Sequence, residues 1–406
     1  MSLSRRAVLR AATVIMSQLN TPAILGRALA QAADPDAVPL RGGEILPDPD
    51  FSLLRHRDPY VIGVRPHREG GVRLELEQVP LPGRSGPKFL IHNYGHGGAG
   101  ITLSFGCASV VAEHVHTLMR DMGRKRRISV AVIGSGVIGL TVASELRRRW
   151  PRLSVTVYAK DLDIRQTTSF KAAGQFEPSG IYEEYETEER RNILADYLRR
   201  SRNRIVELGR EARWSHYGIA FRRNYTLDHA IPAFDSHTPD DVVPKPRTGT
   251  LPFQKLNVAG REYRTWLINP TILLPRLVSD LKRSRVRFRR KLFTDVQAFG
   301  ALRENIVINC TGYGAKKLVQ DDQMLARRGH LVVLKRTLAN QLYFFSGGCA
   351  NYRTLYVFCR HRDIVIGGSV QDGNESEGIT ANDDAVFLRI RENAQNLFDG
   401  RPRQCR

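Results

Sequence analysis

A glycine-rich turn between an apolar strand and a helical run constrains the fold of this chain more than any other feature. Residues 128–161, ISVAVIGSGVIGLTVASELRRRWPRLSVTVYAKD, follow the order strand, tight turn, helix and second strand. Glycines in such a turn let the backbone approach a pyrophosphate, whose charge faces the helix N-terminus. The pattern predicts that a dinucleotide binds at Gly134, Ser135, Gly136, Val137, Ile138 and Gly139. Asp161, near the end of the second strand, is the candidate ribose ligand, and a purely structural turn is the alternative.

The composition indicates a globular protein with a strongly basic surface. The 406 residues, 42% of them hydrophobic, are enough for two or three domains. The net charge of +21 is high, but lysine and arginine are spread along the chain and often lie beside acids, as in residues 182–204. No nucleic-acid recognition pattern accompanies them, so we expect no nucleic-acid partner. A solvated basic surface is favoured over attraction to anionic substrates or an anionic envelope surface.

The first 32 residues have the features of an export signal. Residues 4–10, SRRAVLR, fit the twin-arginine pattern, and small residues predict cleavage after Ala30 or Ala32. Polar residues interrupt the apolar stretch, which argues against a stable membrane span. We expect the twin-arginine export machinery as a partner and a periplasmic or secreted location, with a disordered basic start as the alternative. Residues 33–50, rich in proline, glycine and aspartate, are expected to form a linker.

The cysteines and histidines show no metal-ligand spacing. The five cysteines are odd in number and lack CxxC pairs, which predicts neither a metal site nor a disulfide framework. Cys107 and Cys310 lie in apolar runs and are expected to be small buried residues.

The residues after the βαβ unit resemble the D-amino acid oxidase family. Residues 167–169, TTS, and 172–174, AAG, match a threonine-rich loop and an Ala-Ala-Gly segment of that family, and residues 270–283 and 304–315 continue the match in order. The resemblance implies that FAD is the cofactor, contacted by Thr167, Thr168, Ala173 and Gly174. It also implies an Arg-Gly-Gln turn at 327–330, where His330 replaces the glutamine.

Three side chains match the family's substrate-binding positions. Tyr352 and Tyr356 lie four residues apart beside a strand, and the resemblance implies that Tyr352 binds the substrate carboxylate while Tyr356 lines the pocket. Residues 60–77 contain GVRP and resemble the family's arginine strand. The resemblance implies that Arg65 pairs with the substrate α-carboxylate through two bonds, since the planar guanidinium matches a carboxylate.

Residues 92–102, HNYGHGGAGIT, resemble a loop that runs beside the flavin ring and leads into a helix. The helix N-terminus would place partial positive charge near the N1–C2=O edge of the ring. We expect glycines there because side chains would collide with the ring. The resemblance implies cofactor contacts from Gly97, Gly98, Ala99, Gly100, Ile101 and Thr102.

The order of these segments is inverted relative to the family. The arginine strand and glycine loop close the chain in the family but precede the βαβ unit here, which predicts a circular permutation with GRKRR, residues 123–127, joining the original ends. A degenerate or chimeric gene is the alternative. The expected fold class is α/β, with an FAD-binding Rossmann-like βαβ domain and a mainly antiparallel β substrate domain. We assign residues 69–180 and 288–333 to the first and 51–68, 181–287 and 334–406 to the second.

The resemblance implies an FAD-dependent D-amino acid oxidase that takes a small D-amino acid and O2. Hydride transfer from the substrate Cα–H to flavin N5 would give a 2-oxo acid, ammonia and hydrogen peroxide. D-aspartate oxidase and glycine or secondary-amine oxidase share the architecture and are alternatives. A catalytically silent flavoprotein or an envelope-binding protein is an alternative of another class. The sequence leaves a homodimer open.

Overall fold

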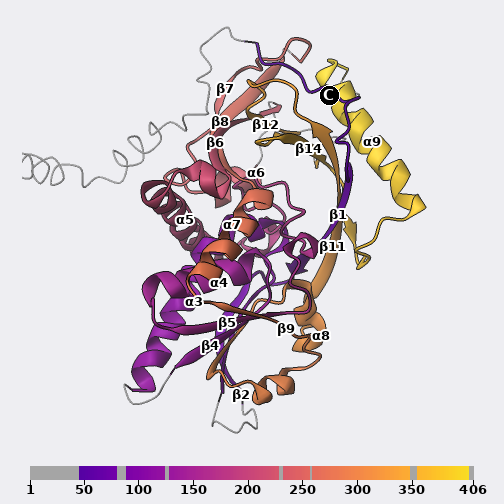
Figure 1. The fold of residues 1–406 in the computed structure, drawn as a ribbon. Coiled ribbons are helices and arrows are strands. Elements are labelled where there is room, and N and C mark those ends of the chain that lie inside the picture. Colours follow the sequence, from indigo (N-terminus) through magenta and orange to yellow (C-terminus); the bar gives the residue numbers. More distant parts are fainter. Residues whose placement is uncertain are drawn as a thin grey trace, which may run out of the picture.

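The computed structural model describes residues 45–79, 88–123, 128–227, 232–256, 258–347 and 354–401. Two β-sheets form the molecule, one covered by long helices and one larger and mainly antiparallel (Figure 1). The predicted leader, Tyr352 and residues 124–127 of the predicted junction lie outside the described residues. Within the described ranges, none of the helices combines the length and the apolar character that crossing a membrane requires.

The six-stranded sheet confirms the predicted βαβ unit. Its strands, in spatial order, are β2 (Arg73–Val79), β3 (Lys88–Tyr94), β10 (Ile306–Asn309), β4 (Ser129–Ile133), β5 (Ser154–Ala159) and β9 (Arg287–Arg290). All neighbours are parallel except β2, which runs antiparallel to β3. Because parallel strands are buried on both faces, β4 and β10 are continuous apolar runs.

Helices α3 (Gly100–Asp121), α4 (Val137–Arg149), α5 (Glu188–Glu211) and α7 (Pro270–Arg283) form one layer on this sheet. Helix α3 packs against α4 and α5, and α4 packs against α7. Helix α7 begins at Pro270, because proline loses no hydrogen bond at the first helical position. Asn269 caps it by accepting a hydrogen bond from the Thr271 N–H at 3.1 Å.

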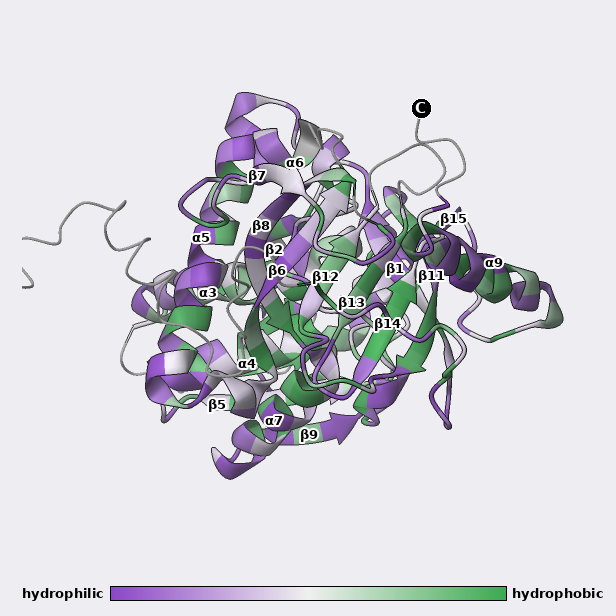
Figure 2. Ribbon diagram, turned by 90° about the horizontal axis from the view of Figure 1, so that it is seen from above, coloured by the Kyte–Doolittle hydropathy of each residue, from purple (hydrophilic) through white to green (hydrophobic). Residues whose placement is uncertain are grey.

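The second sheet has nine strands. Their spatial order is β1 (Tyr60–Arg68), β11 (Met324–Lys335), β14 (Asp363–Gly367), β13 (Tyr356–Cys359), β12 (Tyr343–Ser346), β6 (Ile219–Leu227), β8 (Ala259–Ile268) and β7 (Arg247–Thr250), and β15 (Gln371–Asp372) pairs with β11. Among the described strands of this sheet, only β12 and β6 form a parallel pair. Helix α9 (Ala381–Phe398) packs its apolar side chains on one face, while α6 (Pro232–His237) and α8 (Ala315–Leu318) are short. Figure 2 shows hydrophobic residues along β11, β13 and β14 and hydrophilic residues over much of α5.

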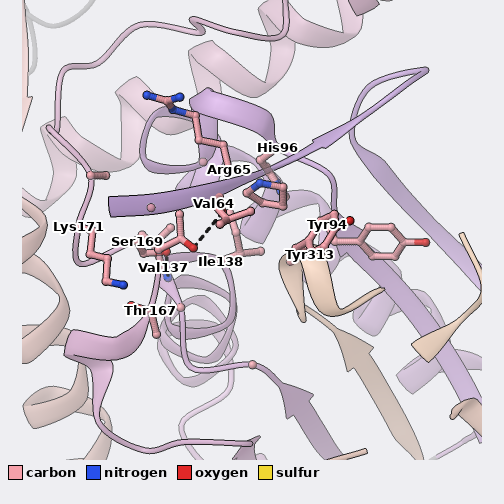
Figure 3. A pocket seen from close by; sticks show the side chains of 18 of the residues that line it. Val64, Arg65, Tyr94, His96, Val137, Ile138, Thr167, Ser169, Lys171 and Tyr313 are labelled. Carbon is pink, nitrogen blue, oxygen red and sulfur yellow. Dashed lines mark hydrogen bonds between the residues drawn. The ribbon is translucent and has the colours of Figure 1, made fainter. Parts of the chain in front are cut away.

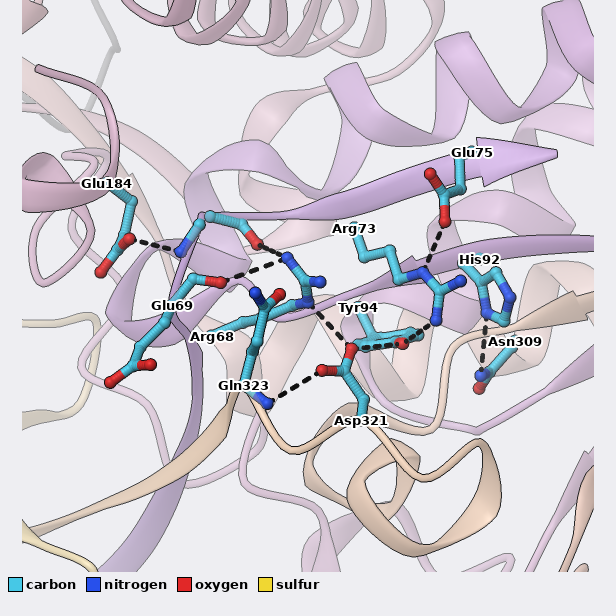
Figure 4. Close-up of polar contacts among 12 residues, drawn as sticks. Arg68, Glu69, Arg73, Glu75, His92, Tyr94, Glu184, Asn309, Asp321 and Gln323 are labelled. Atoms are coloured by element: carbon cyan, nitrogen blue, oxygen red, sulfur yellow. Dashed lines mark hydrogen bonds and ion pairs between the residues drawn. The ribbon is translucent and has the colours of Figure 1, made fainter. Parts of the chain in front are cut away.

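Residues 45–123 are built into both sheets. Strand β1 pairs with β11 from Tyr60↔Val332 to Arg68↔Met324, and β3 lies between β2 and β10. A polar cluster ties these strands to the chain after α8 (Figure 4). Asp321 accepts hydrogen bonds from Arg68 Nε at 2.9 Å and from the Tyr94 hydroxyl at 2.7 Å. Burial acts to raise the pKa of Asp321, but these two bonds outweigh it and the pKa lies below its usual value.

One local expectation was wrong. Residues 327–330, predicted to form a turn, lie in the middle of the twelve-residue strand β11. The apolar run that follows them pairs with β1 and β14 on either side, and Gly329 occupies a regular ladder position opposite Gly63. Pairing with β1 extends from Met324 to Val332 and keeps the backbone extended through the glycine.

Candidate active site

A cavity of about 800 Å³ lies where the two sheets face each other, and both glycine-rich segments line it (Figure 3). Its lining includes most of the side chains and turns that the sequence singled out. The predicted residues on its wall are Arg65, Gly97, Gly98, Gly100, Ile101, Gly134, Ser135, Gly136, Val137, Ile138, Asp161, Thr167, Thr168, Ala173, Gly174 and Tyr356. Gly139, Ala99 and Thr102 do not line it.

The first glycine turn needs glycine for two reasons. Gly134 has φ +122°, and a Cβ there would lie 2.3 Å from the carbonyl oxygen of Cys310. Gly139 is set back from the cavity, and a Cβ there would lie 2.1 Å from the Gly134 carbonyl oxygen. Gly139 therefore allows the helix to pack closely on the turn and does not itself border the cofactor cavity, where the sequence had placed it.

Helix α4 opens toward the cavity. Its N-cap, Gly136, has an extended backbone and no capping side chain, and no acidic residue lies in the first turn. The Val137 N–H donates to the Ser169 hydroxyl at 3.0 Å. A helix N-terminus without an acidic cap favours an anion, which fits a pyrophosphate.

The loop after β5 borders the same end of the cavity. Asp161 lies just after the strand, and its Oδ1 accepts a hydrogen bond from the Asp163 N–H at 2.9 Å. The hydroxyls of Thr167 and Thr168 donate to the carbonyls of Ile164 and Val64 at 2.6 and 3.0 Å. These hydroxyls fix the loop against strand β1. The loop forms a part of the cavity wall that is open to a ligand.

The second glycine segment is constrained by protein contacts. A Cβ on Gly97 would lie 2.8 Å from the Gly180 carbonyl oxygen, and one on Gly98 would lie 2.6 Å from the Ser179 carbonyl oxygen. The glycines are therefore required by the close approach of residues 179–181, whereas the sequence pattern attributed them to the flavin ring alone. Ala99 is fully buried, and the Thr102 hydroxyl donates to the Glu177 carbonyl at 2.9 Å. These two residues hold the loop in place.

Buried polar atoms without protein partners border the cavity. Both side-chain polar atoms of Asn93 and Nε2 of His96 have no hydrogen-bond partner among the described residues, and both residues line the cavity. Burial lowers the pKa of His96 to about 3, so its imidazole is neutral. Buried polar atoms are normally satisfied, so these atoms indicate a polar ligand. Together with the open helix N-terminus, they fit the polar edges of FAD.

Arg65 reaches over a glycine in the neighbouring strand. A Cβ on Gly329 of β11 would lie 2.5 Å from the Arg65 guanidinium nitrogens. Among the described residues no carboxylate lies within 4.0 Å of this guanidinium, and its contact with the Ser369 carbonyl oxygen is 3.5 Å long. Arg65 also interacts with the Tyr356 hydroxyl, so the half-buried cation at the cavity wall has neutral partners and no carboxylate partner, which suits an anionic substrate group.

Tyr356 repeats this arrangement on the neighbouring pair of strands, β13 and β14. Its ring lies across Gly367 of β14, where a Cβ would come within 2.1 Å of the ring. Burial raises the pKa of Tyr356, while the charge of Arg65 acts to lower it. The two predicted substrate residues that the structure describes thus share one wall, and the assignment of Tyr352 stays a prediction.

A buried polar group supports the Arg65 corner. His330 Nδ1 lies 2.8 Å from the Ser369 hydroxyl, and its Nε2 lies 2.8 Å from Asp383 Oδ1. Arg328 pairs with the same carboxylate, and the pKa of Asp383 is held well below its usual value by the Arg328 hydrogen bond. Burial lowers the pKa of His330 despite Asp383. His330 is thus part of the hydrogen-bonded group of residues that supports Ser369 and Gly329.

The sequence pattern did not reveal several polar residues at the opposite end of the cavity. Gln175, Glu177 and Ser346 line it. Gln175 Nε2 donates to Asn224 Oδ1 at 3.1 Å, and the Tyr263 hydroxyl donates to Glu177 Oε2 at 3.2 Å. Gln175 and Glu177 directly follow the Ala-Ala-Gly segment, a position from which they could have been inferred.

Three potential metal ligands come together from β1 and from the segment before α5. Ligand atoms of His67, Glu183 and Glu184 lie within 4.8 Å of one another. Glu183 pairs with Arg327, and Glu184 accepts a hydrogen bond from the Gly70 N–H at 2.6 Å. Donors from the protein thus bind the carboxylates of both Glu183 and Glu184.

Comparison with known proteins identifies the family of this chain. Residues 129–405 match the family described as DAO, FAD dependent oxidoreductase. A D-amino-acid oxidase of Fusarium vanettenii is 25% identical over 301 residues, covering 67% of this chain and 80% of its own length. A D-aspartate oxidase of Homo sapiens is 24% identical over 255 residues, covering 60% of this chain and 69% of its own length. The glycine oxidase structure from Geobacillus kaustophilus gives a TM-score of 0.48 at 16% identity, covering 66% of this chain and 77% of that one. The chain belongs to the DAO family of FAD-dependent oxidoreductases, and FAD is its cofactor.

Proposed function

We propose that this protein oxidises D-amino acids to 2-oxo acids, ammonia and hydrogen peroxide. The observation that carries the proposal is Arg65, a cation without a carboxylate partner among the described residues, on the wall of a cavity that both glycine segments line. A planar guanidinium in this setting is suited to hold an α-carboxylate through two parallel hydrogen bonds.

Positioning is the main contribution of the chain's own residues. Arg65 holds the carboxylate, and the half-buried Tyr356 closes the wall beside it, so the Cα–H bond has one orientation in the cavity. Bound FAD supplies the two-electron acceptor, with O2 as the final oxidant. The substrate loses a hydride from Cα and a proton from its amino group, and the resulting imino acid hydrolyses to the 2-oxo acid and ammonia.

The test is peroxide release by the purified, FAD-loaded protein with D-alanine, D-aspartate and glycine, using L-alanine as the stereochemical control. We expect peroxide with D-amino acids and an Arg65→Ala variant that keeps its flavin absorbance but loses turnover. A preference for D-aspartate or glycine would move the assignment to those alternatives. No peroxide with any amine, despite bound yellow flavin, would overturn the enzyme assignment.

We also propose that the chain is a circular permutant. The family match begins at residue 129, yet Arg65, the second glycine segment and strand β3 precede it. Strand β3 is parallel to β10, and α3 packs on α4, so the early segment fills places in the sheet and helix layer of the matched region. A rearranged chain with residues 128–406 followed by 45–123 should fold, bind FAD and release peroxide at wild-type rates. Failure to bind FAD would contradict the permutation.

Export remains a further part of the proposal. The basis is the SRRAVLR sequence at 4–10, which lies outside the described residues. A mature protein whose measured mass begins after Ala30 or Ala32 would support it. Retention of the full-length mass in periplasmic or secreted fractions would contradict cleavage, and unchanged export of an Arg5→Lys, Arg6→Lys variant would contradict the twin-arginine route.

A further inference from the structure

One face of the nine-stranded sheet forms the floor of the cavity from one end to the other. Side chains that alternate along each strand place Gly329, Gly367, Tyr356 and Ser346 on this face, with Arg65 reaching over it from β1. Beyond the residues that line the cavity, the same face of the sheet continues through β6 and β8, where Asn224 lies opposite Tyr263. Long side chains reach inward from both ends of this row of strands, since Arg65 extends from β1 over Gly329 of β11 and Tyr263 extends from β8 to Glu177.

Glu177 occupies the Tyr263 end of this floor. The Tyr263 hydroxyl donates to its Oε2 at 3.2 Å and the Tyr182 hydroxyl donates to its Oε1 at 3.3 Å. Its backbone is fixed by Thr102, whose hydroxyl accepts from the Glu177 N–H at 3.0 Å. Gln175 completes the corner by bonding Asn224. The carboxylate is therefore held in one position on the cavity wall.

The charge of Glu177 has no counterpart in the described protein. No lysine, arginine or histidine nitrogen among the described residues lies within 4.0 Å of its carboxylate oxygens. Burial raises the pKa of Glu177, although the hydrogen bonds from Tyr263 and Tyr182 act in the opposite direction. A half-buried carboxylate with only neutral donors around it is poorly compensated, and each oxygen keeps a lone pair for a further donor.

The two ends of the cavity thus carry opposite charges. Arg65 and Glu177 both line the cavity, and neither has an ionic partner among the described residues. The α-amino group of an amino acid is one carbon away from its carboxylate and stays at the Arg65 end. A cation on a long side chain lies farther from the carboxylate and is directed to the Glu177 end.

We propose that Glu177 is a specificity-determining residue that binds the guanidinium or ammonium group of a basic D-amino acid whose α-carboxylate is held by Arg65. This inference rests on the proposed D-amino acid oxidase function. The substrate class it names is D-arginine and D-lysine, whose side chains carry a cation at the far end. The same carboxylate disfavours acidic substrates through like-charge repulsion.

The first experiment compares kcat/KM for D-arginine, D-lysine, the neutral D-norleucine and the acidic D-glutamate. A hydrogen bond between charged groups leads us to expect a preference of about 10- to 100-fold for the basic substrates over D-norleucine. Glu177→Gln keeps the size and one acceptor oxygen and should remove this preference, with less than about 3-fold change for D-norleucine. Glu186→Gln makes the same charge change on an exposed residue of the same segment and should keep the preference.

The second experiment measures binding without turnover. The probes are 5-guanidinopentanoate, which is arginine without its α-amino group, and hexanoate as the neutral control, titrated calorimetrically into the FAD-loaded protein. We expect tighter binding of the guanidino compound to the wild type and to Glu186→Gln, and equal binding of both compounds to Glu177→Gln. Flavin absorbance per protein checks that each variant is folded and loaded.

The outcomes separate this inference from the function on which it rests. Turnover of neutral D-amino acids in preference to D-arginine would overturn the inference and leave the oxidase assignment intact. An equal loss for basic and neutral substrates in Glu177→Gln would mean that Glu177 binds the α-amino group instead. Absence of turnover with every D-amino acid would overturn the oxidase function and the inference together.

Discussion

The two sheets contribute to the cavity in different ways. The six-stranded sheet presents backbone: the glycine turn after β4, the open N-terminus of α4 and the loop after β3. The nine-stranded sheet presents side chains, with Arg65 and Tyr356 lying over Gly329 and Gly367 of neighbouring strands. A cofactor common to many enzymes is bound by backbone groups, which every residue has, whereas a particular substrate is recognised by side chains. Substitutions in the six-stranded sheet should therefore impair cofactor binding, and substitutions in the nine-stranded sheet should impair substrate binding.

The largest effect is expected on the cofactor side, from Gly134→Ala. A side chain there is strained at φ +122° and would lie 2.3 Å from the Cys310 carbonyl oxygen, which is backbone and cannot turn away. Together these should cost about 3 kcal/mol or more and displace the turn from FAD. We expect the affinity for FAD to fall at least about 100-fold. The measurement is the ratio of flavin to protein after gel filtration.

Gly123→Ala is the matched control for that substitution. Gly123 also has a positive φ, +72°, but no atom lies within 4 Å of the place that a Cβ would occupy. It should lower stability by about 1 kcal/mol and leave the flavin content unchanged. If both variants retained FAD equally, the close approach to Cys310 would have no part in binding.

On the substrate side, Arg65→Lys should lower kcat/KM by about 100-fold while FAD binding is unchanged. Lysine keeps the charge but loses the two parallel hydrogen bonds to a carboxylate, and truncating a buried charge pair costs about 2–5 kcal/mol. The effect should appear with every D-amino acid tested, because the α-carboxylate is common to all. A variant that retains full activity would show that charge alone, and not the bidentate geometry, holds the substrate.

The same contrast explains what could be predicted from the sequence. The turn at Gly134 and the loop at Gly97 were found because each motif is local, with its spacing written in consecutive residues. The role of Gly329 was missed because it depends on strand register: Gly329 matters only because β1 pairs with β11. For the same reason the segment around Gly329 was expected to be a turn. Glu177 was missed although it lies just after the Ala-Ala-Gly segment. The structure also shows a second reason why position 97 must be glycine, namely its contact with residue 180.

Gly329→Ala should have a smaller effect, confined to substrate binding. The added methyl group would meet the flexible end of Arg65 at 2.5 Å, so the guanidinium would shift rather than the backbone. We expect KM to rise by about 10-fold with little change in kcat or flavin content, because misplacement weakens a charged contact without removing it. Gly249→Ala, on an open position in β7, should change none of these values. An unchanged KM in Gly329→Ala would imply that Arg65 has room to hold the carboxylate from another rotamer.

The smallest effect concerns the uncompensated charge of Glu177 and should appear in stability. The folded-state pKa of Glu177 is raised by burial, so the unfolded chain ionises it first and stability falls as pH rises through the unfolded pKa of about 4.3 toward the folded one. Glu177→Gln should therefore raise Tm by about 1–2 °C at pH 7, with the gain disappearing near pH 4. Glu186→Gln, which alters an exposed carboxylate, should show no such pH-dependent gain.

Addition of 5-guanidinopentanoate should raise Tm more in the wild type than in Glu177→Gln, since the ligand supplies the missing cation. Equal Tm values for wild type and Glu177→Gln across pH 4–7 would mean that water or the protein already compensates this carboxylate, and the contrast between the two ends of the cavity would then be weaker than the geometry indicates.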